Sequence, residues 1–279
     1  MKMDPFQDSR ATRSFWNLCR LCVAGLAAIA SATTATAAIG TWSQDTGFPG
    51  TGVTVSGAGS SPVWTNTNAS AGTGNAAIVA PVTPITLTLG QTITFSGNIN
   101  FGSDGALGNI QFRIGLFDTN TPAVSTSYLG YMAEIPQGVA GVMVGVSANG
   151  TNWEANSGGS LLSLTTNSSR GTSTTPNGST ESPFAFTLSV TDNGSNNNTV
   201  SILFTSADGT SYNWQGVATD TGSAAAANTT YNEVGFFFPG NAPGNSIAFS
   251  NLSVVPEPSS VGLVIAAAGI VAALRRRRR

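Results

Sequence analysis

Apolar and polar residues alternate through most of the middle part of the chain. In the segment 92–101, Ile93, Phe95, Ile99 and Phe101 are separated by small and polar residues. A period of two places successive side chains on opposite faces of an extended strand, so that one face packs inward while the other meets solvent. The pattern predicts about ten half-buried antiparallel strands and no internal helix. The same period recurs at 110–116, 142–146, 184–190, 200–204, 212–214, 234–238 and 247–254.

Turn-forming sequences separate several of these segments. DNGSNNN at 192–198 lies between two predicted strands, and Asp208-Gly209 follows the second. Because Asn, Asp and Gly favour tight turns, these segments are predicted to form a three-stranded meander. The other connections vary widely in length, which favours a two-sheet sandwich over an up-and-down barrel. We therefore predict an all-β fold with one antiparallel sandwich domain at 39–254.

The N-terminal segment 1–38 has the order of a secretory signal peptide. Four basic residues lie within its first twenty positions, an apolar stretch occupies 21–30, and small residues fill 31–38. Ala35 and Ala37 form the A-x-A pattern that signal peptidase accepts. We predict cleavage after Ala37 or Ala38 and export of the remaining chain.

The C-terminal segment 255–279 contains Pro256-Glu257-Pro258, an uncharged stretch at 259–274 and five arginines. As a helix, that stretch would be about 24 Å long, shorter than a hydrocarbon core of about 30 Å. The arginines decide in favour of a transmembrane helix, since they would stay on the cytoplasmic side and halt translocation. A nucleic-acid-binding tail would not explain the apolar stretch directly before the charges. The predicted stop-transfer residues are Arg275, Arg276, Arg277, Arg278 and Arg279.

This C-terminal pattern resembles the PEP-CTERM sorting signal of bacterial envelope proteins. The resemblance implies that Pro256, Glu257 and Pro258 are a processing motif for exosortase, an integral-membrane cysteine protease. It further implies that the chain is anchored transiently in the membrane and then released to the cell envelope or extracellular matrix. Signal peptidase and exosortase are thus the expected processing partners, and extracellular polysaccharide is a candidate ligand.

The middle domain resembles concanavalin-A-like jelly rolls. The segments that carry this resemblance are LTLGQTITFSG, FRIGLFD, GYMAEI and IAFSNLSVV, in this order. The resemblance implies that the sandwich is jelly-roll-like. Threonines such as Thr92 and Thr94 are expected on the solvent face of its strands.

Charge and composition exclude several functions. Between 39 and 254 there are two arginines, no lysine and ten acidic residues, a net charge of −8, which makes nucleic acid an unsuitable partner. The whole chain lacks histidine, and Cys19 and Cys22 both lie within the predicted signal peptide. These absences exclude a Ser/His/Asp triad, a His-ligated zinc site and disulfides in the mature domain.

An enzyme using paired carboxylates is the alternative to a non-catalytic role. Glycosidases of the resembled fold carry an E-x-D-x-E run, whereas Glu134 stands alone in YMAEIPQG. We therefore interpret Glu134 as a polar residue at a strand end and predict no catalytic residue. Two carboxyl groups about 5 to 9.5 Å apart in one cleft would favour the enzyme instead.

Candidate ligand-binding residues combine aromatic rings that stack on sugars with amides that bond sugar hydroxyls. Trp153 lies in a polar loop next to Asn152, and Tyr131 is a second aromatic candidate, whereas Tyr212 and Trp214 are expected in the core.

No cofactor is predicted, although calcium would suit the abundant oxygen donors. The calcium candidates are Asp118, Asn120 and Asp192, none of which lies in a loop with known ligand spacing. DNGSNNN is more simply a hairpin turn. The sequence thus favours a non-catalytic envelope or matrix component that contacts polysaccharide or other surface molecules.

Overall fold

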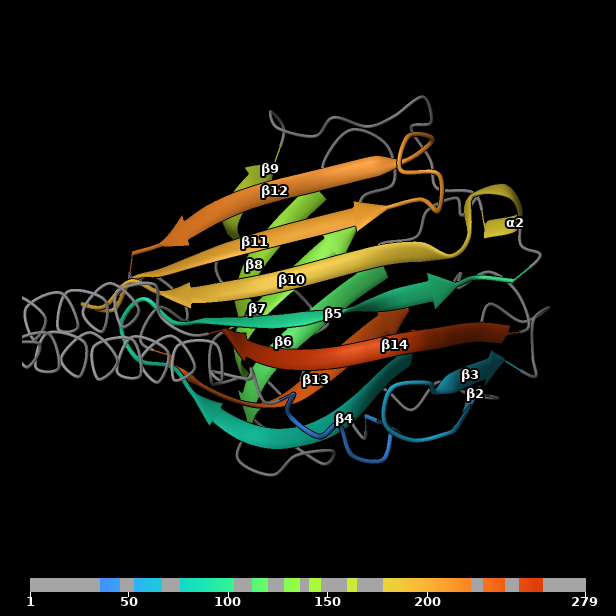
Figure 1. Cartoon of the computed structure of the whole chain (residues 1–279), viewed down its shortest axis with the longest axis horizontal. Coiled ribbons are helices and arrows are strands. Elements are labelled where there is room, and N and C mark those ends of the chain that lie inside the picture. The colour runs from blue at the N-terminus through green and yellow to red at the C-terminus, as the bar shows by residue number, and fades with distance from the viewer. Residues whose placement is uncertain are drawn as a thin grey trace, which may run out of the picture. The chain divides into compact units, whose positions relative to one another are not determined.

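Two antiparallel sheets of seven strands each form the part of the protein that the computed structural model describes (Figure 1). This part belongs to one compact unit, Thr36–Glu257. In Figure 1 the sheet containing β10 and β5 lies in front and its strands cross those of the other sheet. The described residues are 36–45, 53–66, 76–102, 112–119, 128–135, 141–146, 160–164, 178–221, 228–238 and 246–257.

The first sheet, called sheet I here, has the strand order β1-β4-β13-β6-β7-β8-β9. Its strands are β1 (Ser43–Gln44), β4 (Ala76–Thr86), β6 (Phe112–Thr119), β7 (Tyr128–Ile135), β8 (Gly141–Val146), β9 (Ser160–Leu164) and β13 (Thr230–Phe238).

The second sheet, called sheet II, has the order β12-β11-β10-β5-β14-β3-β2. Its strands are β2 (Val53–Ser56), β3 (Val63–Asn66), β5 (Thr92–Asn100), β10 (Phe184–Asp192), β11 (Asn198–Thr205), β12 (Asn213–Asp220) and β14 (Ser246–Glu257).

The main core lies between the sheets and is rich in aromatic residues. Phe236 of sheet I stacks on Phe249 of sheet II with ring centroids 4.4 Å apart, and it also contacts Trp42 at 5.4 Å and Phe95 at 5.5 Å. All four side chains are buried. Aromatic pairs at these separations add to the free energy gained from burying their large apolar surfaces. The predicted inward residues of β5, β10, β11 and β14 belong to this core.

Sheet I is buried on its outer face as well. Seven of the eight residues of β6 are buried, and the first six of them are consecutive. In a half-buried strand, buried and exposed residues would alternate. A second apolar cluster occupies this outer face and contains Ala77, Val79, Phe117, Tyr128, Met132 and Phe237. The outward residues Arg113 and Phe117 of β6 are therefore buried, although apolar residues alternate with a period of two along this strand.

The all-β, two-sheet antiparallel architecture predicted from the sequence is confirmed. The meander of β10, β11 and β12 has the predicted order, and its strands pair in register as neighbours. The DNGSNNN segment forms the β10–β11 hairpin, in which Asp192 Oδ1 accepts a hydrogen bond from Gly194 N at 2.7 Å. Gly194, Ser195 and Asn196 have positive φ angles there, which fits the turn chemistry of Gly and Asn.

Two details of the prediction were wrong. Fourteen strands are present in the described residues, where about ten were expected. The short strands β1 to β3 were missed, and so was β4, which contains Pro81 and Pro84. A one-turn helix, α2 (Gly178–Glu181), also stands where no helix was expected. β4 tolerates its prolines because its pairing with β13 shifts between Tyr231 and Glu233, so the ladder is irregular at that point.

The ends of the compact unit lie close to the predicted processing points. Ala37 forms an antiparallel bridge with Val254, and β14 continues to Glu257. Within the described residues, no helix is both long and apolar enough to cross a membrane. The predicted helix 259–274 and its arginine tail, like most of the predicted signal peptide, fall outside those residues.

Candidate functional site

The outer face of sheet II is lined by hydroxyl and amide groups, and we call it the hydroxyl face. Its residues are those that alternate with the core residues of β5, β10, β11 and β12, so they are exposed or half-buried. The side chains of this face are uncharged. Glu257, at the end of β14, lies at the edge of the face opposite Thr92. The face comprises Thr92, Thr94, Ser96, Asn98, Thr187, Ser189, Thr191, Thr199, Ser201, Leu203, Thr205, Asn213, Gln215, Val217 and Thr219.

Hydrogen bonds between neighbouring strands order the hydroxyl groups of this face. Thr92 and Thr191 are joined by a hydroxyl–hydroxyl hydrogen bond of 2.8 Å, and Thr94 and Ser189 by one of 2.9 Å. A hydroxyl has one donor and two acceptor positions, so each of these groups keeps capacity for a further partner. The strands set the rows about 4.8 Å apart, which produces a regular array.

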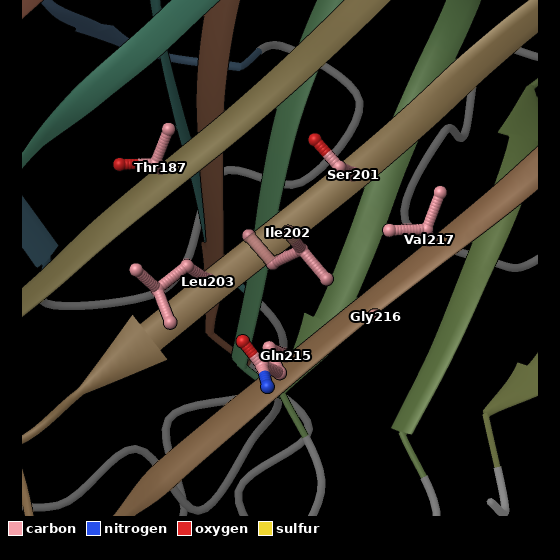
Figure 2. A pocket seen from close by; sticks show the side chains of 7 residues that line it. All are labelled: Thr187, Ser201, Ile202, Leu203, Gln215, Gly216 and Val217. Atoms are coloured by element: carbon pink, nitrogen blue, oxygen red, sulfur yellow. The ribbon is translucent and has the colours of Figure 1, made fainter. Parts of the chain in front are cut away.

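A hollow of about 520 Å³ opens on the hydroxyl face over β10, β11 and β12 (Figure 2). Thr187, Leu203 and Gln215 lie side by side across the three strands, and Ser201 pairs with Val217 in the adjacent row. Leu203 is 38% exposed and Val217 is 60% exposed, so apolar carbon lies beside polar groups. The hollow thus places an amide, hydroxyls and small apolar surfaces beside one another.

Tyr131, a predicted ligand-binding residue, is fully buried between the sheets. Its hydroxyl donates to Asp220 Oδ2 at 3.2 Å and accepts from Asn198 Nδ2 at 3.0 Å. Burial raises the pKa of Tyr131, and the Asp220 carboxylate raises it further, although the hydrogen bond from Asn198 lowers it. Tyr131 therefore stays protonated at neutral pH and joins β7 to β11 and β12 from the interior.

Tyr231 belongs to the same buried polar cluster. Its hydroxyl donates to the main-chain oxygen of Asn228 at 3.3 Å, and Asn198 Nδ2 donates to that oxygen at 2.9 Å. Burial raises the pKa of Tyr231 well above its ordinary value, and the negative charges of Asp192, Asp118 and Asp220 add to the rise. Tyr131 thus donates from sheet I to sheet II, whereas Tyr231 donates to Asn228, whose main-chain oxygen also accepts from Asn198 of sheet II.

Two of the three calcium candidates, Asp118 and Asp192, lie in the described residues. Asp192 uses one carboxylate oxygen to stabilise the β10–β11 turn. Asp118 lies near the end of β6, and partial burial raises the pKa of its carboxyl group. Asn120 lies outside the described residues. Nowhere in the described part do three or more acidic, His or Cys side chains gather as a metal site would require.

Glu134 lies on the buried outer face of sheet I and forms an ion pair. Arg113 donates to Glu134 Oε2 from Nε at 2.9 Å and from Nη2 at 2.8 Å, and the two residues are direct partners across β6 and β7. The Arg113 guanidinium also lies over the Phe237 ring, 5.1 Å from its centroid. A carboxylate held in this way supports a structural role for Glu134.

The other residues considered in the sequence are two aromatic residues expected in the core and two expected at a ligand site. Tyr212 and Trp214 are fully buried, as expected. Trp153 and Asn152, the principal predicted ligand-binding residues, lie outside the described residues. The hollow at Thr187, Leu203 and Gln215 was not singled out from the sequence, although alternation along the three strands places these side chains on the solvent face.

The sorting motif begins inside strand β14. Val255 pairs with Thr94, Pro256 with Ile93 and Glu257 with Thr92. Thr94 Oγ1 also donates to Glu257 Oε1 at 3.1 Å. Pro258 and the residues after it lie outside the described part. The first two residues of Pro-Glu-Pro are therefore part of sheet II.

These features define a β-sandwich whose last strand contains the first two residues of Pro-Glu-Pro. Residues 254–279 match the PEP-CTERM protein-sorting motif, which confirms the resemblance seen in the sequence. The motif implies an exosortase-sorted, exported protein associated with the envelope. No curated protein shows significant sequence similarity to the chain.

Several solved structures are similar to the sandwich in fold. Arcelin-5, a lectin-like defense protein from Phaseolus vulgaris, has 11% identity and a TM-score of 0.44, with 81% of this chain and 99% of that chain covered. The legume lectin-like domain from Entamoeba histolytica has 7% identity and a TM-score of 0.40, with 77% and 88% covered. The Emp47p carbohydrate recognition domain has 12% identity and a TM-score of 0.44, with 78% and 89% covered.

Proposed function

We propose that this protein is a non-catalytic component of the cell envelope or extracellular matrix, sorted by exosortase, whose hydroxyl face contacts uncharged polysaccharide. The observation that carries the polysaccharide contact is the hollow at Thr187, Leu203 and Gln215 within a sheet face that presents hydroxyls and amides. The sorting motif supports the location, because it implies export and processing at the membrane. In this proposal the segment 259–274 anchors the chain transiently before release.

The charge of the domain favours an uncharged polysaccharide over an acidic one. The segment 39–254 has a net charge of −8, so an anionic polymer would be repelled at low ionic strength. The hydroxyl face carries its negative charge only at its edge, at Glu257, among the described residues. Sugar hydroxyls both donate and accept hydrogen bonds, and so do the threonine and serine side chains of the face.

Two observations support a non-catalytic role. Glu134, the acidic residue considered first for catalysis, is paired with Arg113 on the buried face of sheet I. Asp220 is buried and hydrogen-bonded within the polar cluster, and Asp192 is buried and hydrogen-bonded in the β10–β11 turn. A glycosidase requires two carboxyl groups that reach the substrate, one of them able to donate a proton.

The proposal is tested by polysaccharide binding to the purified unit Thr36–Glu257. Affinity electrophoresis through neutral glucans, an anionic alginate and the producing organism's own extracellular polysaccharide measures the retardation. We expect saturable retardation by a neutral polymer, weakened about tenfold by Gln215→Ala combined with Thr187→Ala, since two hydrogen bonds are lost.

Ser201→Glu supplies a stronger test because it places a charge beside the hollow at a half-buried, solvent-facing position. Its matched control is Thr83→Glu, an exposed position on β4 of sheet I. Loss of binding in Ser201→Glu and retention in Thr83→Glu would support the hydroxyl face. Binding lost only in Trp153→Ala would place the ligand near Trp153. Release of sugar from any polymer would contradict the non-catalytic role and favour the enzyme.

A further inference from the structure

The sorting motif and the last strand of the sandwich share residues, which constrains where the chain is cut. The motif match begins at Val254, whereas β14 ends at Glu257. Val254 is fully buried and pairs with Phe95, and the pairing with β5 continues in register through Glu257. A membrane protease that acts near Pro-Glu-Pro therefore meets a segment that is already part of a sheet.

The C-terminal half of β14 is anchored at several points. The register shifts between Ser250 and Ser253, and within this bulge Asn251 has a φ of 55° while Leu252 packs into the core. Leu252 N donates to Ser60 O at 3.1 Å. On the edge of β14 away from β5, Ala37 N donates to Val254 O at 2.8 Å. These contacts hold both sides of the strand immediately before the motif.

Pro256 fits this position in the sheet. β3 pairs with β14 only from Ser246 to Ala248, so beyond Val254 the described residues place no further strand beside β14 opposite β5. A proline lacks the main-chain N–H and is accepted in a sheet at such an edge, where that group has no ladder partner. The motif's first proline and the pairing of β14 are thus compatible.

Proteases bind substrate as an extended strand whose main-chain groups pair with the enzyme. The main chain of Val255–Glu257 is paired with β5 and cannot enter a protease active site until the end of β14 opens. Cleavage of such a segment follows the small population of the open form. Peptide bonds before Glu257 are therefore protected in the folded domain, whatever the protease.

We propose that the fold determines the cleavage site. Exosortase cleaves the folded protein on the C-terminal side of Glu257, and the mature domain keeps Val255-Pro256-Glu257 as the end of β14. This inference rests on the proposed sorting by exosortase. Its consequence is that the released domain retains the pairings of Thr92, Ile93 and Thr94 with β14. The cut leaves the hydroxyl face intact up to its edge.

The first test is the C-terminus of the processed protein. The full chain is co-expressed with an exosortase, the released form is isolated, and its intact mass and C-terminal peptide are determined by mass spectrometry. We expect a last residue at Glu257 or beyond. A released domain that ends at Pro256 or earlier would overturn the inference. Absence of release would instead contradict the proposed sorting, and the second test would still decide the inference.

The second test needs no exosortase. A proline-specific endoprotease acts on the purified full chain and on a synthetic peptide of residues 250–262, and mass spectrometry follows cutting of the bond after Pro256. We expect this bond to be cut at least tenfold more slowly in the full chain than in the peptide. Leu252→Ala, which removes the buried side chain of the bulge, should accelerate the cut in the full chain, whereas the exposed-site control Val217→Ala should not. Equal rates in the full chain and the peptide would overturn the inference.

Discussion

Ala37 and Val254 face each other in the fold, with Ala37 N donating to Val254 O at 2.8 Å. Ala37 is buried in the main core, and the neighbouring Ala38 O accepts a hydrogen bond from Thr83 N at 3.1 Å. The residues just before the predicted signal-peptidase cut therefore contribute to the sandwich, beside the strand that leads into the sorting motif. The two ends of the compact unit support each other.

A domain that begins at Ile39 should be less stable than one that begins at Thr36. It lacks the buried Ala37 side chain and two main-chain hydrogen bonds, so we expect the free energy of unfolding to fall by about 1–3 kcal/mol. Urea unfolding of the two purified fragments, each ending at Glu257, measures the difference. Equal midpoints would show that the bridge between Ala37 and Val254 adds nothing to stability.

Breaking the buried ion pair should destabilise the domain strongly. Glu134→Gln leaves the Arg113 guanidinium buried without its counter-charge, which costs about 3–5 kcal/mol in comparable pairs. Replacing both partners, with Arg113→Met and Glu134→Leu, should recover most of that loss because no isolated charge remains. Chemical denaturation of the wild type and the two variants provides the measurement, and a Glu134→Gln domain as stable as the wild type would contradict the role assigned to the pair.

Alkaline pH should weaken the fold. Burial raises the pKa values of Tyr131 and Tyr231 in the folded state, whereas in the unfolded chain tyrosines ionise near pH 10. Above about pH 10 the unfolded state binds fewer protons than the folded state, so stability falls as pH rises, by up to about 1.4 kcal/mol per pH unit for each tyrosine. Urea midpoints between pH 8 and 11.5 test this, and Tyr131→Phe should give a shallower decline.

The sequence was sufficient to predict a strand and its buried face where the other face of that strand meets solvent. In β10 the buried and half-buried residues alternate without a break, and its predicted inward face agrees with the structure, although the strand extends from the predicted end at 190 to Asp192. Thr92 and Thr94 likewise lie on the solvent face, as expected. Alternation is visible there because the two faces of the strand have different chemistry.

The sequence was insufficient where that contrast disappears. In β7 nearly every residue is buried, so the pattern could not show that Tyr131 points into the interior. The partnership of Arg113 with Glu134 depends on the register between β6 and β7, which no local pattern contains. The hollow on the hydroxyl face arises where three strands lie side by side, so it too required the pairing of strands to be known.

Phe236 should be among the most sensitive core positions. Its ring contacts Trp42, Phe95 and Phe249, so Phe236→Ala removes packing between the two sheets and should cost about 3–5 kcal/mol. Val217→Ala, at a position that is 60% exposed, is the matched control and should change stability by less than about 0.5 kcal/mol. Thermal and urea unfolding of both variants separate a core effect from a general one.

The bulge of β14 should leave no room for a side chain at Gly97. A Cβ added there would collide with Leu252 Cδ2 and would lie 3.1 Å from Leu252 Cα and 3.2 Å from Ser250 O. Gly97→Ala should therefore destabilise the domain by about 1–3 kcal/mol, because the Leu252 side chain must leave its position in the core. In a double-mutant cycle with Leu252→Ala the two losses should be less than additive, since the shorter side chain relieves the closest contact. Additive losses would contradict this explanation, because they would show that the close approach of β5 to the Leu252 bulge of β14 is not the cause of the destabilisation.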